Sequence, residues 1–339
     1  MIADVEQLEE ALSRPPDRLV EAFRSLDGDV LVLGAGGKMG PTLTRMAARA
    51  VAAAGVPSRV HAVSTFSNAG HRRRLEEADV VTHATDVSNP KDLANLPDAK
   101  HFIYMVGRKF GSSGSEWETW ATNVLVSAGV ASRYASSNVV VFSSGNVYPL
   151  TPVDSRGATE DTTPAPIGEY AMSCLGRERM FDYVAHHKGL RAVHYRLNYA
   201  VELRYGILVD VATKVMRGEP IDVTMGHVNV VWQGYANAVA LEALAWCANP
   251  PFILNVTGPE TVSVRALAER FGELFDKTPV LRGDEAPTAL LSNATRCHEL
   301  FGVPDVGVDT MITWVADWLA RGGATLDKPT HFETRTGQF

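Results

Sequence analysis

The sequence predicts an α/β fold in which a doubly wound parallel sheet carries a smaller C-terminal lobe. From Asp29 onward, short apolar runs alternate with longer amphipathic stretches. The apolar runs lack polar alternation, which is typical of strands that helices cover on both faces. Because strand–helix repetition places successive strands in parallel, the pattern indicates one large sheet. A chain of 339 residues, 45% of them hydrophobic, is long enough to bury such a sheet.

Residues 1–27 are predicted to form a helical extension that precedes the sheet. Apolar residues at helical spacing begin at Val5 and end at Leu26, and Pro15 and Pro16 interrupt them. We therefore expect two short helices that dock on the larger domain.

Six apolar runs are the predicted strands of a first domain over residues 28–200. They are DVLVLG (29–34), RVHAVST (59–65), DVVTHAT (79–85), HFIYMVG (101–107), NVVVFSS (138–144) and RAVHYRL (191–197). Amphipathic segments between the strands predict helices near 38–54, 89–95, 115–136 and 169–187.

The regular alternation weakens after about Asn198, so residues 201–339 are assigned mainly to the smaller lobe and a tail. Helices are predicted near 207–217, 233–247, 263–276, 292–300 and 308–320, with short strands near 228–231 and 252–256. We expect the 238–250 region to return to the first domain. The tail has aromatic residues at Phe332 and Phe339. Two placements of it stay open, over the second lobe or against a neighbouring subunit.

Composition and charge exclude several classes of protein. Lys and Arg total 32 against 39 Asp and Glu, and the net charge of -7 disfavours nucleic-acid partners. The three cysteines are scattered and none belongs to a CxxC pair, so we expect neither a disulfide framework nor a metal site. The acidic N-terminus and the lack of a long apolar run predict a cytoplasmic protein without membrane association.

The segment LVLGAGGKMG places glycines where the first strand meets the first long helix. Gly34, Gly37 and Gly40 have the spacing at which a backbone without side chains approaches a pyrophosphate, and the helix N-terminus adds unpaired N–H groups. We expect a nucleotide site here, with Lys38 and Met39 among its contacts. The alternative is a tight turn that serves only close helix packing.

The end of the second strand lacks the carboxylate that usually binds the adenosine ribose of a dinucleotide. Ser64 and Thr65 stand there, and an arginine run at 72–74 follows closely. Hydroxyl and guanidinium groups suit a 2′-phosphate, which slightly favours NADP over NAD. A solvated helix face explains the arginines equally well.

Six motifs in order resemble the extended short-chain dehydrogenase/reductase family, which contains NAD-dependent sugar epimerases and dehydratases. They are GAGGKMG, ATDVSNPKDL, IYMVGRKFG, TNVLVSAGV, FSSGNVYP and EYAMSCLGRE. The resemblance extends from residue 29 to about residue 275. It implies a Rossmann-like dinucleotide-binding domain over residues 28–200 and a mainly substrate-binding lobe over residues 201–339. The further cofactor contacts that it implies are Asp86, Val87, Met105, Val106 and Gly107.

The resemblance also implies a catalytic set. Ser144 would hydrogen-bond the reacting oxygen, Tyr170 would exchange its proton beside the cofactor, and Asn123 would support the arrangement near it. Cys174 lies one helical turn after Tyr170, where the family has the lysine of YxxxK. That lysine holds the nicotinamide ribose and lowers the pKa of the tyrosine. A free phenol has a pKa of about 10, so about one molecule in a thousand is ionised at pH 7.

Three explanations of the cysteine stay open. In the first, Arg177 replaces the lysine, because it lies three residues beyond Cys174 on the same helical face. In the second, the reaction needs Tyr170 only as a proton donor, for which a neutral phenol suffices. In the third, the protein binds NAD(P) without turnover, as a sensor or regulatory subunit, and Cys174 fills space. Nothing near Cys174 in the sequence depresses its pKa, which argues against a nucleophilic thiol.

Candidate substrate residues besides Ser144 follow the sixth strand, where the family places substrate contacts. They are Asn198, Arg204 and Tyr205. A planar guanidinium suits a carboxylate or phosphate, and a tyrosine suits the face of a sugar. A helix-capping loop with a surface arginine is the alternative. We expect a carbohydrate or sugar-acid substrate and reversible hydride transfer.

Members of the family often dimerise through two helices, one of which carries the tyrosine. The resemblance therefore implies a homodimer. The residues expected near its interface are Ala121, Leu125, Met172 and Met180.

Overall fold

The computed structural model of the chain describes residues 1–109 and 114–337. The aromatic end of the tail at Phe339, and the part of the IYMVGRKFG motif after Lys109, lie outside the described residues.

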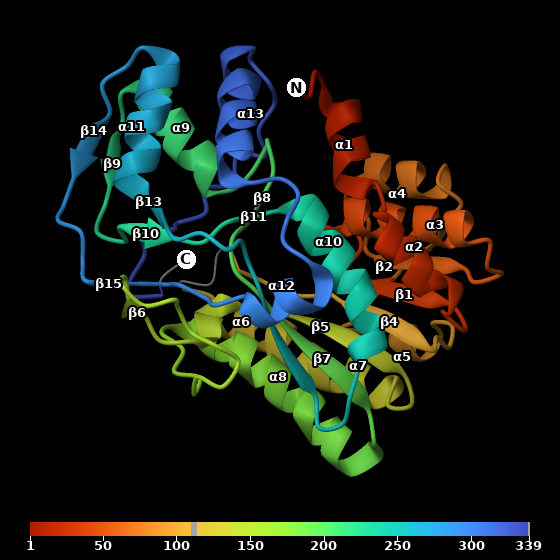
Figure 1. Cartoon of the computed structure of the whole chain (residues 1–339). Coiled ribbons are helices and arrows are strands. Elements are labelled where there is room, and N and C mark those ends of the chain that lie inside the picture. The colour runs from red at the N-terminus through yellow and green to blue at the C-terminus, as the bar shows by residue number, and fades with distance from the viewer. Residues whose placement is uncertain (110–113, 338–339) are drawn as a thin grey trace.

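Seven parallel strands form the central sheet, which confirms the predicted fold class (Figure 1). All six predicted strands of the first domain belong to it. In spatial order the strands are β12 (Phe252–Val256), β7 (Arg191–Leu197), β5 (Asn138–Ser144), β4 (His101–Tyr104), β1 (Val30–Leu33), β2 (Val60–Ser64) and β3 (Val81–Ala84).

The edge strand β12 differs from the division of the chain expected from the sequence. It pairs in parallel with β7, with Phe252 opposite Val193, so the half assigned mainly to the smaller lobe supplies a strand of the large sheet. The run itself was predicted as a strand. Its partner is remote in the sequence, and hydrophobic pattern alone does not say which sheet a strand joins.

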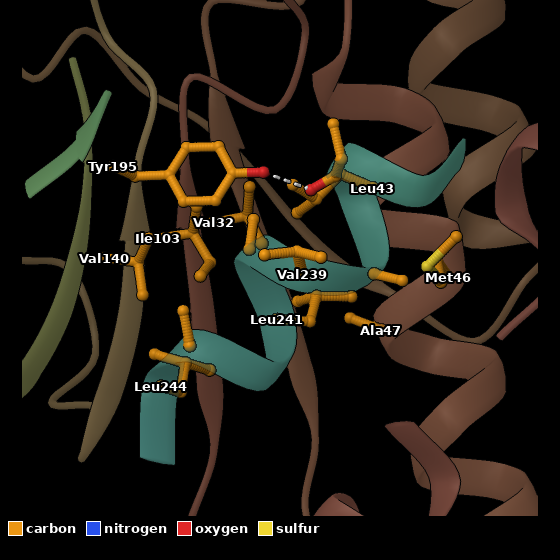
Figure 2. Packing of buried hydrophobic residues seen from close by; sticks show 14 of the residues in the cluster. Val32, Leu43, Met46, Ala47, Ile103, Val140, Tyr195, Val239, Leu241 and Leu244 are labelled. Atoms are coloured by element: carbon orange, nitrogen blue, oxygen red, sulfur yellow. Dashed lines mark hydrogen bonds between the residues drawn. The ribbon is translucent and has the colours of Figure 1, made fainter. Parts of the chain in front are cut away.

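Helices cover both faces of the large sheet. On one face, α3 (Gly40–Ala54) and α10 (Gln233–Glu242) pack on apolar side chains of β1, β4, β5 and β7. Figure 2 shows Val239 and Leu241 of α10 between α3 and the strands, and the Tyr195 hydroxyl donates to the Ala236 carbonyl at 2.7 Å. The helices α5 (Pro90–Ala94), α7 (Val126–Arg133) and α8 (Glu169–Lys188) cover the other face.

The smaller lobe is built on three helices that share an apolar cluster: α9 (Ile207–Arg217), α11 (Val264–Phe275) and α13 (Val308–Ala320). Figure 1 shows these helices grouped to one side of the large sheet. Four two-stranded sheets complete the structure. They pair β9 (Pro220–Asp222) with β14 (Val280–Arg282), β10 (His227–Val228) with β13 (Val262–Ser263), β11 (Val231–Trp232) with β8 (Ala200–Val201), and β15 (Thr288–Ala289) with β6 (Thr151–Pro152). The short helices η3 (Ala243–Trp246) and α12 (Thr295–Phe301) follow α10 and β15.

The N-terminal extension consists of the two predicted helices, α1 (Val5–Ser13) and α2 (Asp17–Arg24). Leu8 and Leu12 of α1 are buried in the apolar cluster of the smaller lobe. Leu19 and Phe23 of α2 are buried instead in the cluster on the large sheet. The extension therefore contributes to both hydrophobic cores.

Two helical segments differ from the sequence prediction. α4 (Ala69–Glu76) was not among the helices predicted from periodicity, because its only buried side chain is Leu75 and it shows no apolar stripe. Only the alternative interpretation of the arginines at 72–74 assumed a helix face there. The helix expected near 115–136 divides into α6 (Glu116–Trp120), a π-helical turn η1 (Ala121–Leu125) and α7. In the described part of the chain, no helix combines the length and apolar character needed to cross a bilayer.

Candidate active site

The glycine turn and the loop after β4 lie side by side at the carboxyl edge of the sheet. β1 is bonded to both β2 and β4, and the strand order reverses at this point. A crevice at such a reversal is where open α/β sheets bind ligands. Gly34, with a φ of 90°, starts the turn, and a Cβ on it would lie 2.9 Å from the Met105 carbonyl carbon.

The glycines keep the turn open toward this crevice. A Cβ on Gly36 would lie 2.4 Å from the Ser64 Oγ, and one on Gly40 would lie 2.5 Å from the Ala35 carbonyl oxygen. Gly37 is exposed and its N–H donates to the Gly34 carbonyl oxygen. The sequence analysis did not single out Gly36, although it has one of the tightest surroundings. This bare backbone ahead of α3 fits the diphosphate of a dinucleotide.

At the adenosine end of the predicted dinucleotide site, few of the expected side chains face the glycine turn. Ser64 lies against the turn and its Oγ accepts from the Phe66 N–H, whereas Thr65 is exposed. The arginines at 72–74 are all exposed on α4, and Arg72 donates to Glu76 and to the Thr82 hydroxyl. They occupy a solvated helix face, as the alternative interpretation expected.

A histidine that the sequence analysis missed lies closer to the turn than the arginines. Burial, with a contribution from Arg74, lowers the pKa of His71, and the nearby Gly36 backbone acts in the opposite direction. Farther along the edge, Asp86 is exposed and its carboxylate accepts from the Ser88 N–H, while Val87 is buried. Val87 also lines a hollow of about 630 Å³ between α5 and α7.

A small cavity of about 160 Å³ lies at the other end of the glycine turn. The structure brings Ser144 at the end of β5, Tyr170 in the first turn of α8 and Asn198 after β7 to this cavity. The remaining residues that line it are Lys38, Met39, Lys109, Ser143, Asn146, Leu197, Tyr199, Ala200, Val201, Tyr205, Gly206 and Thr330. The predicted hydroxyl pair and part of the predicted substrate set are therefore neighbours in space.

The phenol of Tyr170 stays protonated at neutral pH. Burial raises its pKa well above 10, and the adjoining Cys174 adds to the rise. Arg177 and a hydrogen bond with Ser144 act in the opposite direction but do not reverse it. Tyr170 is therefore suited to donate a proton and poorly suited to remove one.

Cys174 lies beside the phenol as a neutral thiol. It is fully buried, and burial raises its pKa although Arg177 and a hydrogen bond from Tyr170 lower it. A thiol that keeps its proton is a weak nucleophile. Cys174 packs with Val147, Tyr148 and Ala158, so its main contribution is to fill space and to contact the phenol.

Arg177 lies buried behind the loop that follows β4. Its guanidinium donates to the Phe142 carbonyl and to the Asn123 Oδ1, both at 2.7 Å. A Cβ on Gly107 would lie 2.5 Å from the Arg177 Nη2, so a glycine there lets the guanidinium approach the loop. The Arg177 guanidinium therefore supplies a positive charge near Tyr170, as the hypothesis of a replacement cation expected. It does not occupy the position of Cys174 itself.

Asn123 connects the loop after β4 to α8. Its Oδ1 accepts from the Arg108 N–H at 2.8 Å, and its Nδ2 donates to the Arg108 carbonyl and to the Ser173 hydroxyl. Asn123 belongs to the π-helical turn η1, and such turns often occur at functional sites. Met105 and Val106 precede this loop and are only partly buried.

A buried ion pair fixes the base of the site. Arg196 of β7 donates to both carboxylate oxygens of Glu178, at 2.9 and 2.7 Å, and to the Tyr148 hydroxyl at 2.7 Å. Glu178 also accepts from the Ser143 hydroxyl. Because Ser143 adjoins Ser144, this network links the strand that carries Ser144 to the helix that carries Tyr170.

The three candidate substrate residues after β7 separate in the structure. Asn198 and Tyr205 line the cavity, but Arg204 does not. The Arg204 guanidinium is bound by Glu9 at 2.7 Å and by Glu202 at 3.1 Å, and it faces a neighbouring hollow of about 630 Å³. The sequence could not reveal this pairing, because Glu9 belongs to the N-terminal extension.

Several residues that line the cavity were not singled out from the sequence, and three of them have a distinct place in it. Lys109 follows β4, Tyr199 follows β7, and Thr330 belongs to the C-terminal segment. Tyr199 has a φ of 43°, which is costly for a bulky side chain and often marks a functional position. Within the described residues, no group of His, Cys, Asp or Glu side chains has the arrangement needed for a metal ion.

The profile of the NAD dependent epimerase/dehydratase family matches residues 30–201, which is slightly more than half of the 339 residues. The chain belongs to this family. The matched segment contains the glycine turn, Ser144, Tyr170 and Asn198. The family is NAD dependent by its description, and the comparisons give no support to a preference for NADP. A comparison of this chain with curated proteins found no match in sequence.

Solved structures share the fold at low sequence identity. The UDP-glucose 4-epimerase of Thermotoga maritima, determined with UDP-glucose, is 15% identical with a TM-score of 0.72, over 87% of this chain and 99% of its own. A variant UDP-glucuronic acid 4-epimerase of Bacillus cereus, in complex with NAD and a fluorinated UDP-sugar, is 15% identical with a TM-score of 0.73, over 86% and 99%. MoeE5 with UDP-glucose and NAD is 20% identical with a TM-score of 0.67, over 87% and 99%.

Proposed function

We propose that this family member is an NAD-dependent oxidoreductase or epimerase that transfers hydride to and from a carbohydrate or sugar-acid derivative. The observation that carries the proposal is the placement of Tyr170 and Ser144 in one cavity beside the glycine turn. In such a cavity a neutral phenol can protonate the oxygen of a carbonyl group, and a neighbouring serine hydroxyl can hydrogen-bond the same oxygen. The fold similarity to sugar epimerases agrees with this chemistry.

NAD is the cofactor that the site supports best. The diphosphate would lie on the glycine turn at Gly34, Gly36 and Gly37, and the reactive ring would lie near Met105 and Tyr170. When bound, NAD accepts a hydride from the substrate and returns it. NADP remains the comparison in every binding test, because Ser64 rather than a carboxylate ends β2.

The chain's own residues divide the remaining work. When a carbonyl group is reduced, Tyr170 would donate its proton to the reacting oxygen, which Ser144 hydrogen-bonds. In the reverse direction, when the alcohol is oxidised, the phenolate form of Tyr170 would take that proton back. Arg177 holds positive charge behind Tyr170, which stabilises the phenolate left after the proton has moved. Asn123 is a positioning residue, because it fixes Arg177 and the Arg108 backbone.

Catalytically silent binding of NAD is the second candidate function. Two observations favour it: the strongly raised pKa of Tyr170 and the neutral thiol of Cys174 at the position of the family's lysine. A protein of this kind would bind the dinucleotide at the glycine turn and turn over no sugar.

A homodimer is proposed for the helices that flank the site. Leu125 on η1 is 71% exposed, and Trp117 on α6 is 66% exposed. Met172 on α8 is also exposed, whereas Ala121 and Met180 are partly buried. Large apolar side chains on adjoining helices favour contact with a second copy of the chain.

The proposed function is tested by incubating the protein with NAD and each of a panel of free and nucleotide-linked sugars, and by following the absorbance of NADH. We expect turnover by the wild type, at least a roughly hundredfold loss in Tyr170→Phe, and a smaller loss in Arg177→Met. Tyr183→Phe is the matched control, because Tyr183 lies on the same helix and is 60% exposed. Turnover that survives in Tyr170→Phe would contradict the assigned role of the phenol.

Calorimetric binding of NAD separates the two candidate functions. Tight NAD binding without turnover of any sugar, in the wild type and in Cys174→Lys, would favour the silent binder. Turnover gained only in Cys174→Lys would indicate that the natural chain lost its catalytic cation.

A further inference from the structure

Two lysines converge on the Tyr170 cavity from different loops. The Lys38 ammonium, from the glycine turn, lies 3.5 Å from the centre of the Tyr205 ring and 3.5 Å from the Ala200 carbonyl oxygen. The Lys109 ammonium, from the loop after β4, donates to the Thr330 carbonyl at 3.3 Å and lies 5.9 Å from the centre of the Tyr170 ring. Both side chains line the same cavity.

The environment of the Lys38 ammonium is short of negative charge. Within the described residues, Lys38 makes no ion pair. The carboxylates that act on it are Glu202 and Asp210, while Lys109 and Lys328 repel it. Glu202 is bound to Arg204, and Asp210 accepts from the Thr330 N–H and hydroxyl. Burial raises the pKa of both carboxyls, and each is already engaged by these partners.

Burial also disfavours the two ammonium groups. It lowers the pKa of Lys38 to about 7 and that of Lys109 to about 8. An anion placed between them would restore the charged form of both and would relieve their mutual repulsion. An anionic ligand beside Lys38 would offset the cost of keeping this cation in a small cavity.

We propose that this cavity binds a small substrate with a carboxylate group, which lies between Lys38 and Lys109 while the reacting oxygen lies at Tyr170 and Ser144. This inference rests on the proposed function of the same site and narrows its substrate to a sugar acid. It also assigns Lys38 to the substrate, whereas its place in the glycine turn predicted a cofactor contact.

The C-terminal segment limits the size of that substrate. Thr330 forms part of the cavity wall and is held to α9 by Asp210, with the N–H bond at 2.8 Å. Farther along, Arg335 donates to the Thr288 carbonyl at 2.6 Å, and a Cβ on Gly168 would lie 2.5 Å from the Gly337 carbonyl oxygen. Figure 1 places this end of the chain between the two lobes.

The C-terminal segment therefore forms part of the cavity wall on the side of the smaller lobe. Sites for larger ligands usually measure about 300–1,000 Å³, and this cavity measures about 160 Å³. The substrate is therefore a free sugar acid without a nucleotide group.

Calorimetry on the NAD-saturated protein tests the inference with defined probes: a four-carbon aldonate, a hexonate, a hexuronate, the neutral hexose and a UDP-hexuronate. We expect at least one free acid to bind about tenfold or more tightly than the neutral hexose and the UDP-sugar. Lys38→Met should remove that advantage, by about tenfold or more, and leave the NAD affinity unchanged. Lys91→Met on the exposed face of α5 is the control.

Several outcomes would overturn the inference. A Lys38→Met protein that loses NAD affinity instead would return Lys38 to the cofactor. A UDP-sugar that binds more tightly than every free acid would show a nucleotide-linked substrate, and binding of none of the acids would remove the anion site. Thermal melting of the Lys38→Met variant and of a parallel Lys109→Met variant shows whether a loss of affinity comes from the site or from unfolding of the protein.

The same experiment distinguishes this inference from the proposed function. Tyr170-dependent turnover of neutral or UDP-linked sugars, unaffected by Lys38→Met, would refute the acid substrate and leave the enzyme function standing. Binding of a free acid that depends on Lys38, without turnover of any probe, would refute the enzyme function and keep the anion site.

Discussion

Removal of the buried Glu178 carboxylate should destabilise the protein by about 3–5 kcal/mol. Glu178 is 0% exposed and Arg196 is 2% exposed. Two hydrogen bonds join them, and Glu178→Gln would leave the guanidinium buried without a counter-charge. Removing one partner of a buried ion pair lowers the free energy of unfolding by more than the intact pair contributes to it. The reason is that the remaining charge is left buried without a counter-charge or water.

The pH dependence of this pair follows from the same contacts. Burial alone would raise the pKa of Glu178, but the bond from Arg196 and the nearby positive charges hold it below its ordinary value of 4.5. A lowered carboxyl pKa stabilises the folded state above the unfolded pKa. The contribution is therefore complete above about pH 4.5 and is lost as the pH falls through the lowered value.

Thermal unfolding measures the loss. For a chain of this length, 1 kcal/mol corresponds to roughly 2 °C, so Glu178→Gln should lower Tm by about 5–10 °C. Glu273→Gln is the matched control, because Glu273 pairs with Arg270 on the surface and such pairs contribute about 1 kcal/mol or less. The double variant Glu178→Met with Arg196→Met should recover most of the stability, since it buries no charge.

The reasoning would be refuted if Glu178→Gln lost less than about 1 kcal/mol, or if the double variant were no more stable than the single one. A stable Glu178→Gln protein would mean that Arg196 is solvated or paired elsewhere. The network would then not hold β5 and α8 together at the site.

Three further predictions concern the turn, the cavity and the surface. Gly36→Ala places a Cβ 2.4 Å from the Ser64 Oγ and should weaken calorimetric NAD binding about tenfold. Adding Ser64→Gly should restore most of the affinity, and no rescue would argue against that clash. The affinity for a sugar acid should be highest below pH 7 and fall by up to about tenfold per unit above the Lys38 pKa of about 7, because a neutral amine does not attract a carboxylate. An affinity that stays flat from about pH 6 to about pH 9 would contradict that charge. Leu125→Glu should convert a dimer into a monomer in light scattering, and an unchanged mass would place the interface elsewhere.

The glycine turn was predictable because its chemistry is local. Gly34, Gly37 and Gly40 lie within seven consecutive residues after an apolar run, and no remote contact is needed to recognise them. The same holds for α9 and α13, whose bounds the apolar periodicity predicted. In contrast, α4 has an arginine-rich surface and one buried side chain, so its pattern carries little signal.

The two candidate catalytic hydroxyls were predicted from motifs, whereas their electrostatics were not. Ser144 and Tyr170 lie together as the resemblance implied. The raised pKa of Tyr170 depends on burial by elements from both halves of the chain, and the sequence cannot state that burial. Arg177 was a candidate cation in the sequence, but only the structure places its guanidinium behind Gly107.

Arg204 illustrates the opposite case. Its position after β7 predicted a substrate contact, yet the N-terminal helix α1 supplies Glu9 as its partner. Lys109 lies in the IYMVGRKFG motif but was not singled out there, and Thr330 lies in no motif. Both reach the cavity because a loop and the C-terminal segment fold over it. Pairing between segments so far apart in the chain follows from tertiary packing and leaves no local pattern.

The sequence by itself determined the doubly wound sheet and the glycine turn, because period and spacing act over short stretches of chain. Its resemblance to the family implied the two hydroxyl residues. The tertiary structure decided which charges meet: Arg196 with Glu178, Arg204 with Glu9, and Lys38 with Lys109. The physical reason is that a charge responds to burial and to its neighbours in space. Both are fixed only when the two lobes and both chain ends pack together.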